Sequence, residues 1–343
     1  MALVELFLNR LIDFQRLLRI SVTHESKVVA MNGWVIDYSL SLVNKTGAFY
    51  LTRDLVESFR EDWSDVRRWR SHGVREYSPL ERKVRAKLML RELSADCRVQ
   101  LLPDWPRKPG HDYLHMDPLY CLNDRLTEDD RLVCHDIGPI TNPEVYDQNT
   151  CSTYGRAYEK ILAARPKMTF VSHATKDAFT SHFGDDFPSL DVIPLYLRNS
   201  LARGSGAKVD RPSEMESVGD SFFLSVGEVG ARKGQLDMIR GFAASGLHDE
   251  GFRYVICGPK GFGYDAVASS AAETPGVQLF SYVSDQALRW LYSKAIAFVL
   301  LSRIEGFGIP AIEAPLTGVF PLISRDPALR EVTGGHATCV DSY

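Results

Sequence analysis

The sequence of 343 residues lacks the features that define several protein classes. No uninterrupted apolar run approaches the ~18 residues that a membrane-spanning helix needs. The six cysteines form no Cys-x-x-Cys pair and have no metal-ligand spacing. We therefore interpret them as reduced packing residues, with a disulfide or zinc role as the alternative. The net charge of −4 gives no electrostatic attraction to nucleic acid. This composition indicates a cytoplasmic, soluble protein, and the length fits two domains.

The first 26 residues have the apolar periodicity of an amphipathic helix. One face of this helix holds the apolar residues Val4, Phe7, Leu8, Leu11, Phe14 and Leu18. Two acidic residues, and the lack of a small-residue cleavage site after the helix, argue against a signal peptide. We favour a helix packed on the domain. The alternative is peripheral membrane contact at the inner face of the cytoplasmic membrane, with Arg10, Arg16 and Arg19 near lipid phosphates.

The second half of the chain alternates strand-like and helical segments. The apolar runs "FFLSV", "RYVIC", "VQLF", "FVLLS" and "FPLIS" are separated by helical stretches such as "GQLDMIRGFAAS" and "SDQALRWLYSKA". This alternation predicts βαβ units and a parallel sheet. Ligands of such sheets bind at the carboxyl ends of the strands, so the loops that follow these runs are the candidate sites.

The first half has the same character with less regularity. We expect strands within 27–41, in "DRLVCHD" and in "KMTFVSH", and a helix over "AFYLTRDLVESF". The charged stretch from about 59 to 84 is interpreted as a solvated helix and loop, with an acceptor-binding or membrane-facing insertion as the alternative. The polar stretch 201–221, which contains Gly, Ser and Pro, is the best candidate for an interdomain linker. Two α/β domains imply an interdomain cleft, where ligands most often bind.

The stretch "SRIEGFGIPAIEAP" places two glutamates around a strand-to-helix turn. Gly306 and Gly308 form the turn, and Pro310 suits the first turn of the helix that follows. The free amides of such a helix N-terminus suit a phosphate or diphosphate, and the glycines allow its close approach. Glu305 and Glu313 then lie on either side of the bound group, where a carboxylate accepts hydrogen bonds from sugar hydroxyls. The alternative is a capping glutamate and a surface glutamate.

The stretch "SVGEVGARKGQ" is a second strand end with a glycine-bearing loop. It carries Arg232 and Lys233, whose fixed charges can stabilise the negative charge that gathers on a departing diphosphate. The alternative is a solvated basic pair. A third stretch, "GPKGFGYD", lacks the Gly-Lys-Ser/Thr ending of a phosphate loop, so we interpret it as a turn, with contact to a nucleotide base as the alternative.

These stretches, with "LRWLYSKA" and "PALREVTG", resemble the donor half of the retaining glycosyltransferases of family 4. The "G…RKG" loop and the two glutamates separated by seven residues occur in the order and spacing of that family. "NKTGAFYLTRDL", "VCHDIGPITNPE" and "FVSHATKDAF" in the first half are similar more loosely. The resemblance covers residues 28 to 340. It implies a GT-B fold, in which two Rossmann-like parallel-sheet domains face each other across a cleft.

The resemblance implies an acceptor-side domain over residues 1–200 and a nucleotide-sugar donor domain over 201–343. The family continues for several helices beyond this point, so we expect the chain to be truncated at its C-terminus. Many family members also have an arginine where this chain has Glu228. In this chain Arg232 would have to take that role.

In the donor domain the resemblance implies a role for four side chains. Arg232 and Lys233 would hold the donor diphosphate, Glu313 would hold the nucleotide ribose, and Glu305 would contact the transferred sugar. Arg232, Lys233 and Glu305 are thus candidate catalytic residues.

The resemblance also implies roles for backbone groups and for the first domain. The amides of Gly308 and Ile309 would bind the donor phosphates, and Gly47 would bring a loop close to the donor. His135, the remaining catalytic candidate, would lie beside the sugar and the acceptor. Without the resemblance we would interpret His135 as capping a turn with Asp136.

The family implies transfer with retention, without a metal and without another cofactor, to a glycan or lipid-linked acceptor. The "RKG" loop favours GDP-mannose and polysaccharide or O-antigen assembly. One alternative is a non-catalytic nucleotide-sugar-binding or scaffold subunit, which product formation would distinguish from an enzyme. A nicotinamide oxidoreductase comes last, because no G-x-G-x-x-G turn follows the first predicted strand.

Overall fold

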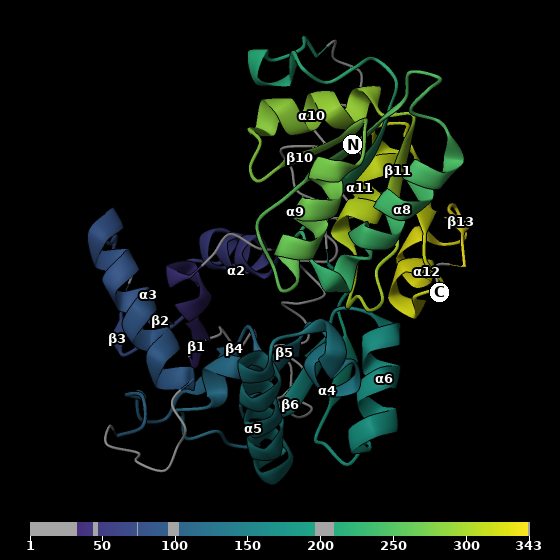
Figure 1. Cartoon of the computed structure of the whole chain (residues 1–343). Helices are drawn as coiled ribbons and strands as arrows, with labels where there is room; N and C mark the ends of the chain where they lie inside the picture. The colour runs from purple at the N-terminus through teal and green to yellow at the C-terminus, as the bar shows by residue number, and fades with distance from the viewer. Residues whose placement is uncertain (1–32, 44–46, 74, 95–102, 196–208, 342–343) are drawn as a thin grey trace. The chain divides into compact units, whose positions relative to one another are not determined.

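The computed structural model describes residues 33–43, 47–73, 75–94, 103–195 and 209–341. Contacts between residues divide the chain into two compact units: Met1–Ile140 with Gln148–Tyr196, and Thr141–Asp147 with Leu197–Tyr343. We call these the N-terminal and the C-terminal unit; both are α/β structures (Figure 1). The predicted helix over 1–26 and the predicted domain boundary at 200 lie outside the described residues.

The described N-terminal unit is built on a seven-stranded sheet in the order β3-β2-β1-β4-β5-β6-β7. Its strands are β1 (Trp34–Asp37), β2 (Asp65–Arg68), β3 (Ser71–His72), β4 (Asp112–His115), β5 (Arg131–Cys134), β6 (Lys167–Phe170) and β7 (Leu190–Val192). All neighbouring strands run parallel except the β2–β3 hairpin at one edge. The predicted strands "DRLVCHD" and "KMTFVSH" are confirmed as β5 and β6, and β1 lies within the predicted opening strand.

The connections between these strands are largely helical. The helices are α2 (Gly47–Ser58), α3 (Pro79–Ser94), α4 (Gly138–Thr141), α5 (Gln148–Ala164) and α6 (His173–Phe183), with short 3₁₀ turns η1 (Ser39–Leu42), η2 (Pro118–Cys121) and η3 (Pro143–Val145). The helix α2 confirms the prediction over "AFYLTRDLVESF". Ser172 starts α6, since its hydroxyl accepts a hydrogen bond from the Thr175 amide at 3.0 Å.

The described C-terminal unit contains a six-stranded parallel sheet in the order β10-β9-β8-β11-β12-β13. Its strands are β8 (Phe222–Val226), β9 (Arg253–Cys257), β10 (Val277–Phe280), β11 (Ala297–Leu300), β12 (Phe320–Ile323) and β13 (Thr338–Cys339). Its helices are α8 (Gln235–Ser245), α9 (Tyr264–Glu273), α10 (Asp285–Lys294), α11 (Ile309–Leu316) and α12 (Pro327–Thr333), with 3₁₀ turns η4 (Ser213–Met215) and η5 (Ala231–Lys233). The predicted alternation of strands and helices is confirmed.

Both faces of this second sheet are buried. In β9, Tyr254 and Ile256 pack into one core, while Val255 and Cys257 pack into another. Successive side chains of a strand point to opposite faces, so an apolar strand of this kind needs helices on both sides. This explains why the strands of the C-terminal unit are continuous apolar runs in the sequence.

The prediction of a solvated helix and loop from about 59 to 84 is confirmed for 79–84, where the exposed start of α3 lies, and is wrong for 65–72. This stretch contains β2, which pairs with β1 inside the sheet, and Arg67 on β2 is fully buried. The charge of Arg67 is tolerated there because two buried carboxylates face it, as described below.

The cysteines in the described residues agree with the interpretation as reduced packing residues. Cys121, Cys134 and Cys257 are buried, Cys151 and Cys339 are half-buried, and all five are free thiols. In the part of the chain that the structure describes, no helix combines the length and the apolarity that crossing a membrane would require.

Candidate functional site

The loop after β8 is held in place by the loop after β9. The Val229 amide donates to the Pro259 carbonyl and the Ala231 amide donates to the Phe262 carbonyl, each at 2.8 Å. A Cβ at Gly230 would lie 2.2 Å from the Phe262 carbonyl oxygen, so only glycine fits at that position. The stretch "GPKGFGYD" is thus a turn, as predicted, and it supports the backbone of the "GEVGARKG" loop.

The loop after β11 ends at the glycine turn that the sequence predicts. Gly308 caps α11 with a φ of 83°, and Pro310 lies in the first turn of the helix. A Cβ at Gly308 would lie 2.3 Å from a terminal carbon of Leu329 in α12. The left-handed φ and this close approach both require glycine.

The two loops, about 70 residues apart in the sequence, meet and bring three predicted site residues together. The Arg303 amide donates to the Arg232 carbonyl at 2.9 Å. Arg232 Nη1 lies 3.2 Å from Glu305 Oε2, and Lys233 Nζ forms an ion pair with Glu305 Oε1. The Ser302 hydroxyl also donates to Glu305 Oε1, at 2.7 Å. We call Arg232, Lys233 and Glu305 the loop cluster.

Within the loop cluster two cations face one carboxylate. Glu228 and Asp326 place two further carboxylates near it. The side chains of Lys233 and Glu305 are only 8 and 6 % exposed. Burial and the neighbouring Arg232 lower the pKa of Lys233. Burial alone would raise the pKa of Glu305, but Lys233 and Arg232 lower it to about 2. The two cations thus lie near the loop that leads into the N-terminus of α11, a position that suits an anion.

Asp326 belongs to the same neighbourhood and was missed by the sequence analysis. Its Oδ1 accepts a hydrogen bond from the Leu329 amide at 3.0 Å and so caps α12. Its Oδ2 accepts from the Glu305 amide at 3.1 Å, which ties the loop after β11 to α12. Burial, and to a lesser extent Glu305, raise the pKa of Asp326 to about 6. Its position before a proline at a helix start gave only the signal of a helix cap.

Glu313, the second predicted glutamate, lies inside α11 and is buried. It is 1 % exposed, and the Tyr292 hydroxyl donates to its Oε2 at 3.1 Å. A ribose hydroxyl would have to share the carboxylate with this tyrosine. The predicted contact of Glu313 with a ribose stays a prediction, as does phosphate binding by the amides of Gly308 and Ile309.

The remaining predicted site residues, His135 and Gly47, belong to the N-terminal unit. His135 directly follows β5, and its Nε2 donates to the Met116 carbonyl at 2.9 Å. Asp136 accepts from the Gly138 amide at 2.8 Å and so caps a turn by itself, whereas the alternative interpretation gave this role to His135 together with Asp136. Gly47 is the first residue of α2. The predicted roles of His135 and Gly47 stay predictions.

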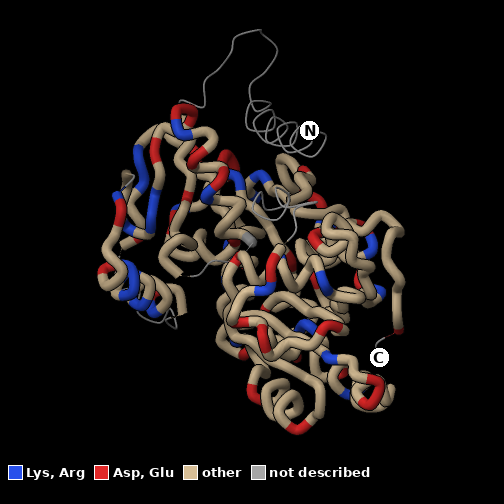
Figure 2. The backbone as a smooth tube through the Cα atoms, turned by 90° about the horizontal axis from the view of Figure 1, so that it is seen from above, with Lys and Arg blue, Asp and Glu red and all other residues tan. Residues whose placement is uncertain are grey.

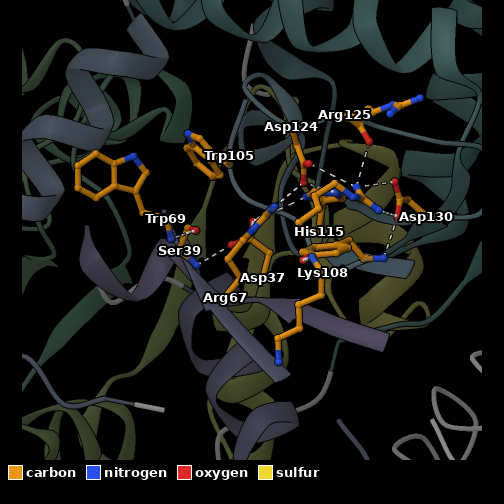
Figure 3. Close-up of polar contacts among 12 residues, drawn as sticks. Asp37, Ser39, Arg67, Trp69, Trp105, Lys108, His115, Asp124, Arg125 and Asp130 are labelled. Atoms are coloured by element: carbon orange, nitrogen blue, oxygen red, sulfur yellow. Dashed lines mark hydrogen bonds and ion pairs between the residues drawn. The ribbon is translucent and has the colours of Figure 1, made fainter. Parts of the chain in front are cut away.

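The N-terminal unit also contains a group of charged side chains, which was not predicted from the sequence. Asp37, Arg67 and His115 stand side by side in one row across β1, β2 and β4, because the strand register pairs Asp37 with both neighbours. Arg67 contacts Asp37 at 2.5 Å and Asp124 at 2.6 Å. His115 lies between the two carboxylates, at 3.8 Å from Asp37 and 3.5 Å from Asp124 (Figure 3).

This row is extended by Arg107, which contacts Asp130 at 2.7 Å and Asp124 at 3.4 Å. The guanidinium groups of Arg67 and Arg107 lie 4.6 and 4.1 Å from the ring centre of Tyr113. We call Asp37, Arg67, Arg107, His115, Asp124 and Asp130 the buried charge cluster. All of these side chains except Arg107 are fully buried. Burial would raise the pKa of Asp37, but Arg67 holds it well below its usual range.

The C-terminal unit matches the sequence model of a known protein family. Residues 208–342 match the family described as glycosyl transferases group 1. Over these residues the C-terminal unit is similar to the domains of that family. The matched residues include the whole loop cluster, Asp326 and Glu313.

Several curated relatives of this chain are mannosyltransferases by name. The chain is 23% identical over 247 residues to the O-antigen chain mannosyltransferase B of Escherichia coli, over 69% of this chain and 63% of the relative. It is 31% identical over 221 residues to the serotype-specific mannosyltransferase WbdA of Escherichia coli, over 60% of this chain and 27% of the relative. The matches thus span less than two thirds of these relatives.

Solved structures of glycosyltransferases share the fold. A UDP-forming trehalose-phosphate synthase from Burkholderia xenovorans aligns with a TM-score of 0.58 at 11% identity, over 90% of this chain and 87% of that one. WaaG, a glycosyltransferase involved in lipopolysaccharide biosynthesis, aligns with a TM-score of 0.53 at 12% identity, over 88% and 84%. The predicted fold class is confirmed: the chain has the two Rossmann-like α/β domains of the GT-B fold.

Proposed function

We propose that this chain is a retaining, metal-independent glycosyltransferase that transfers a hexose from a nucleotide sugar to a glycan or lipid-linked acceptor. Its relatives are named as mannosyltransferases, two of them as O-antigen chain enzymes and two as using GDP-mannose and a cellobiosyl-diphosphopolyprenol acceptor. These names favour mannose as the sugar, GDP-mannose as the donor, and polysaccharide or O-antigen assembly as the process.

The observation that carries the proposal is the loop cluster at the carboxyl ends of β8 and β11. Two cations and one carboxylate lie beside the N-terminus of α11, within the residues that match the glycosyl transferases group 1 model. In transfer, Lys233 and Arg232 stabilise the diphosphate as its bond to the sugar breaks. These fixed charges supply the stabilisation that a metal ion supplies in other sites, which is why we propose a reaction without metal.

The other predicted residues complete the proposed site. Glu313 binds the nucleotide ribose, Glu305 binds the transferred sugar, and the amides of Gly308 and Ile309 bind the phosphates. In the N-terminal unit, His135 lies beside the sugar and the acceptor, and Gly47 brings the start of α2 to the donor. The acceptor hydroxyl loses its proton to the donor phosphate on the same face of the sugar, which gives retention.

The first test is calorimetric titration of the chain with GDP, UDP, GDP-mannose and UDP-glucose in the presence of EDTA. We expect GDP and GDP-mannose to bind and the uridine compounds to bind more weakly. Selective binding of UDP would keep the enzyme class and change the donor. If none of the four binds without metal, the proposed donor site is wrong.

Two substitutions separate binding from transfer. Lys233→Ala is expected to lower the transfer rate about 10²–10³-fold, the usual effect of removing one group that stabilises transition-state charge. Glu313→Ala is expected to weaken nucleotide binding by about 1–3 kcal/mol, because a bound ribose loses its charged acceptor. The transfer rate is measured as mannose transfer to lipid-linked oligosaccharides, and nucleotide binding is measured by calorimetry. The control is Lys294→Ala, at an exposed position, which should change neither.

Unchanged transfer by Lys233→Ala together with unchanged affinity of Glu313→Ala would contradict the site assignment. Nucleotide-sugar binding without any product, over a broad set of acceptors, would instead support the non-catalytic alternative. Retention is checked by the anomeric configuration of the product, read from its NMR coupling constants.

A further inference from the structure

The sheet of the C-terminal unit has a switch point between β8 and β11. From β8 the chain adds β9 and β10 on one side, and from β11 it adds β12 and β13 on the other. Ligands of open parallel sheets bind at the carboxyl end of such a switch point. The loop cluster lies there, because the loops after β8 and β11 carry its three residues. A nucleoside attached to a diphosphate at this point can extend along the sheet edge towards β9 and β10 or towards β12 and β13.

The two sides of the switch point differ in their exposed aromatic side chains. Phe262, on the loop after β9, is 46 % exposed, and Tyr282, on the loop after β10, is 83 % exposed. On the other side, Ser324 and Asp326 follow β12 and are buried, and Asp326 caps α12. Among the described residues of that side, Phe320 is the exposed aromatic residue, and it lies at the amino end of β12. Stacking on an aromatic ring stabilises a bound nucleobase, so we expect the base on the side of β9 and β10.

Glu228, on the loop after β8, is an exposed carboxylate beside the loop that carries Phe262. A Cβ at Gly261 would lie 2.4 Å from the carboxyl carbon of Glu228, so this side chain packs directly on the backbone of that loop. The backbone carbonyl of Glu228 accepts a hydrogen bond from Gln235 at 2.9 Å. Within the residues that the structure describes, its carboxylate accepts no hydrogen bond and pairs with no cation. Carboxylates occur over the whole chain (Figure 2), so Glu228 is distinguished by its place and its lack of a partner.

The charge of Glu228 opposes the binding of a diphosphate at the loop cluster. Burial and Arg232 lower the pKa of Lys233. Glu305 and Glu228 oppose this shift, so Glu228 acts on the same ammonium group that is proposed to hold the diphosphate. A carboxylate in this place repels phosphate oxygens and lowers the affinity for them. Its presence is explained if it accepts hydrogen bonds from another part of the same ligand.

We propose that Glu228 selects guanine as the base of the nucleotide donor. Guanine presents two neighbouring donors, N1–H and the N2 amino group, and the two oxygens of one carboxylate accept both hydrogen bonds. Uracil presents a single donor, N3–H, between two carbonyl oxygens that a carboxylate repels. Phe262 stacks against the base. This role of Glu228 rests on the proposed function, because it concerns the donor of that reaction, but it follows from the loops of the C-terminal unit and not from the names of relatives.

Two other charged residues on this side of the sheet fit the role less well. Asp265 is an exposed carboxylate in the first turn of α9. A carboxylate in a first turn stabilises its helix through the helix dipole, which accounts for Asp265 without a ligand. Lys260, on the loop after β9, lies over the Tyr264 ring with its Nζ 4.4 Å from the ring centre. Glu228 has no such structural role, and it is the carboxylate that lies between the loop cluster and the loop after β9.

The test is calorimetric titration of the full chain with GDP, inosine diphosphate (IDP) and UDP at one pH and one salt concentration. The base of IDP is guanine without the N2 amino group, so IDP probes one of the two hydrogen bonds. We expect GDP to bind most tightly, IDP about tenfold more weakly and UDP about 100-fold more weakly, because a hydrogen bond to a charged group contributes about tenfold or more. Equal affinity of the natural chain for GDP and IDP, or a preference for UDP, would overturn the proposal.

Three variants test which side chain selects the base. Glu228→Gln keeps the size of the side chain and removes its charge, so GDP should bind about 10–100-fold more weakly and its preference over IDP should disappear. UDP should bind equally or slightly more tightly, because the repulsion of its phosphates is removed. The matched control is Asp265→Asn, which removes an exposed carboxylate of the same side and should leave the ratio of GDP to UDP affinity unchanged. Phe262→Ala should weaken all three nucleotides about tenfold, because stacking tolerates every base.

The outcomes distinguish the role of Glu228 from the proposed function. If GDP binds and Glu228→Gln keeps the full preference for GDP over IDP and UDP, Glu228 does not select the base, while the proposed donor site stands. Loss of the preference in Asp265→Asn would give the role to α9 and also overturn the proposal. If none of the three nucleotides binds to the natural chain, the proposed function itself is contradicted. All three variants change exposed side chains, so unchanged thermal unfolding midpoints verify that they fold.

Discussion

The two units of this protein each place charged side chains at the carboxyl ends of parallel strands, with opposite outcomes. In the N-terminal unit, Asp37, Arg67 and His115 stand on the strands themselves, and none of these side chains is exposed. In the C-terminal unit, Arg232 and Glu305 stand on loops beyond the strands, close to the glycine turn of α11. The same edge of a parallel sheet thus holds an internal network in one unit and a candidate site in the other.

The charge balance of the two groups also differs. In the buried charge cluster, three carboxylates face two guanidinium groups and the His115 ring, and Tyr113 lies against both guanidinium groups. In the loop cluster, two cations face one carboxylate. A dense charge network therefore does not by itself mark a binding site. The two groups differ more clearly in position, because the loop cluster lies on loops near the N-terminus of α11, where a helix start favours an anion.

The largest expected effect comes from breaking the buried charge cluster. Arg67→Ala leaves Asp37 and Asp124 buried without their guanidinium partner, and we expect a loss of about 3–5 kcal/mol in the free energy of unfolding. Urea unfolding of the full chain measures it. The control is Arg53→Ala, whose partly exposed ion pair with Asp54 should contribute less than about 1 kcal/mol. Equal losses in the two variants would mean that the cluster does not stabilise the sheet.

The sequence predicts the C-terminal unit better than the N-terminal unit, and the same difference between their strands explains why. The strands of the C-terminal unit are apolar runs, and their glycine turns are visible as such, so the strands, the helices and the loops of Arg232 and Glu305 were all predicted. In the N-terminal unit, β2 reads "DVRR", and its arginines suggested a solvated segment. The ion pairs that bury Arg67 come from residues 30 positions before and 57 positions after it, and single-sequence periodicity carries no such information.

Asp326 shows a second limit of sequence reasoning. Its sequence context predicts a helix cap, and the structure agrees, since it caps α12. The hydrogen bond from Glu305 to its other oxygen depends on how β11 and β12 lie side by side. Periodicity predicts that both strands exist, but the distance between the two loops emerges only when the sheet is assembled.

A smaller effect is expected from the pH dependence of Asp326. Its pKa of about 6 lies above the 3.8 of an unperturbed Asp, so the folded chain holds this proton more tightly than the unfolded chain. The resulting stabilisation is fully present below pH 3.8 and is lost as the pH rises through 6. At about 1.4 kcal/mol per pKa unit, it amounts to about 3 kcal/mol between pH 4 and 7.

The variant Asp326→Asn cannot titrate, and one of its side-chain atoms can still accept a hydrogen bond. Its stability relative to the natural chain should therefore improve by up to about 3 kcal/mol between pH 4 and 7. Urea unfolding at several pH values measures the difference. Glu250→Gln, at an exposed carboxylate, is the control. A constant difference between Asp326→Asn and the natural chain at all pH values would contradict the raised pKa.

The smallest expected change concerns the ion pairs inside the loop cluster, and it tests whether these pairs compete with a ligand. Glu305 forms ion pairs with both Arg232 and Lys233, the residues proposed to hold the donor diphosphate. Binding of the diphosphate must compete with this carboxylate for the two cations. Glu305→Gln removes the competing charge, so we expect a bound nucleoside diphosphate to gain about tenfold in affinity, or about 1.4 kcal/mol.

Transfer should fall in the same variant, because Glu305 is also proposed to bind the transferred sugar. Calorimetry with GDP and a transfer assay separate the two effects. Ser302→Ala, which removes a hydrogen bond to Glu305 but leaves its charge, should not tighten binding. The matching change in the buried charge cluster, Asp37→Asn, should lower stability without changing nucleotide affinity. Weaker binding by Glu305→Gln would mean that Glu305 holds the two cations in place for the diphosphate and does not compete with it.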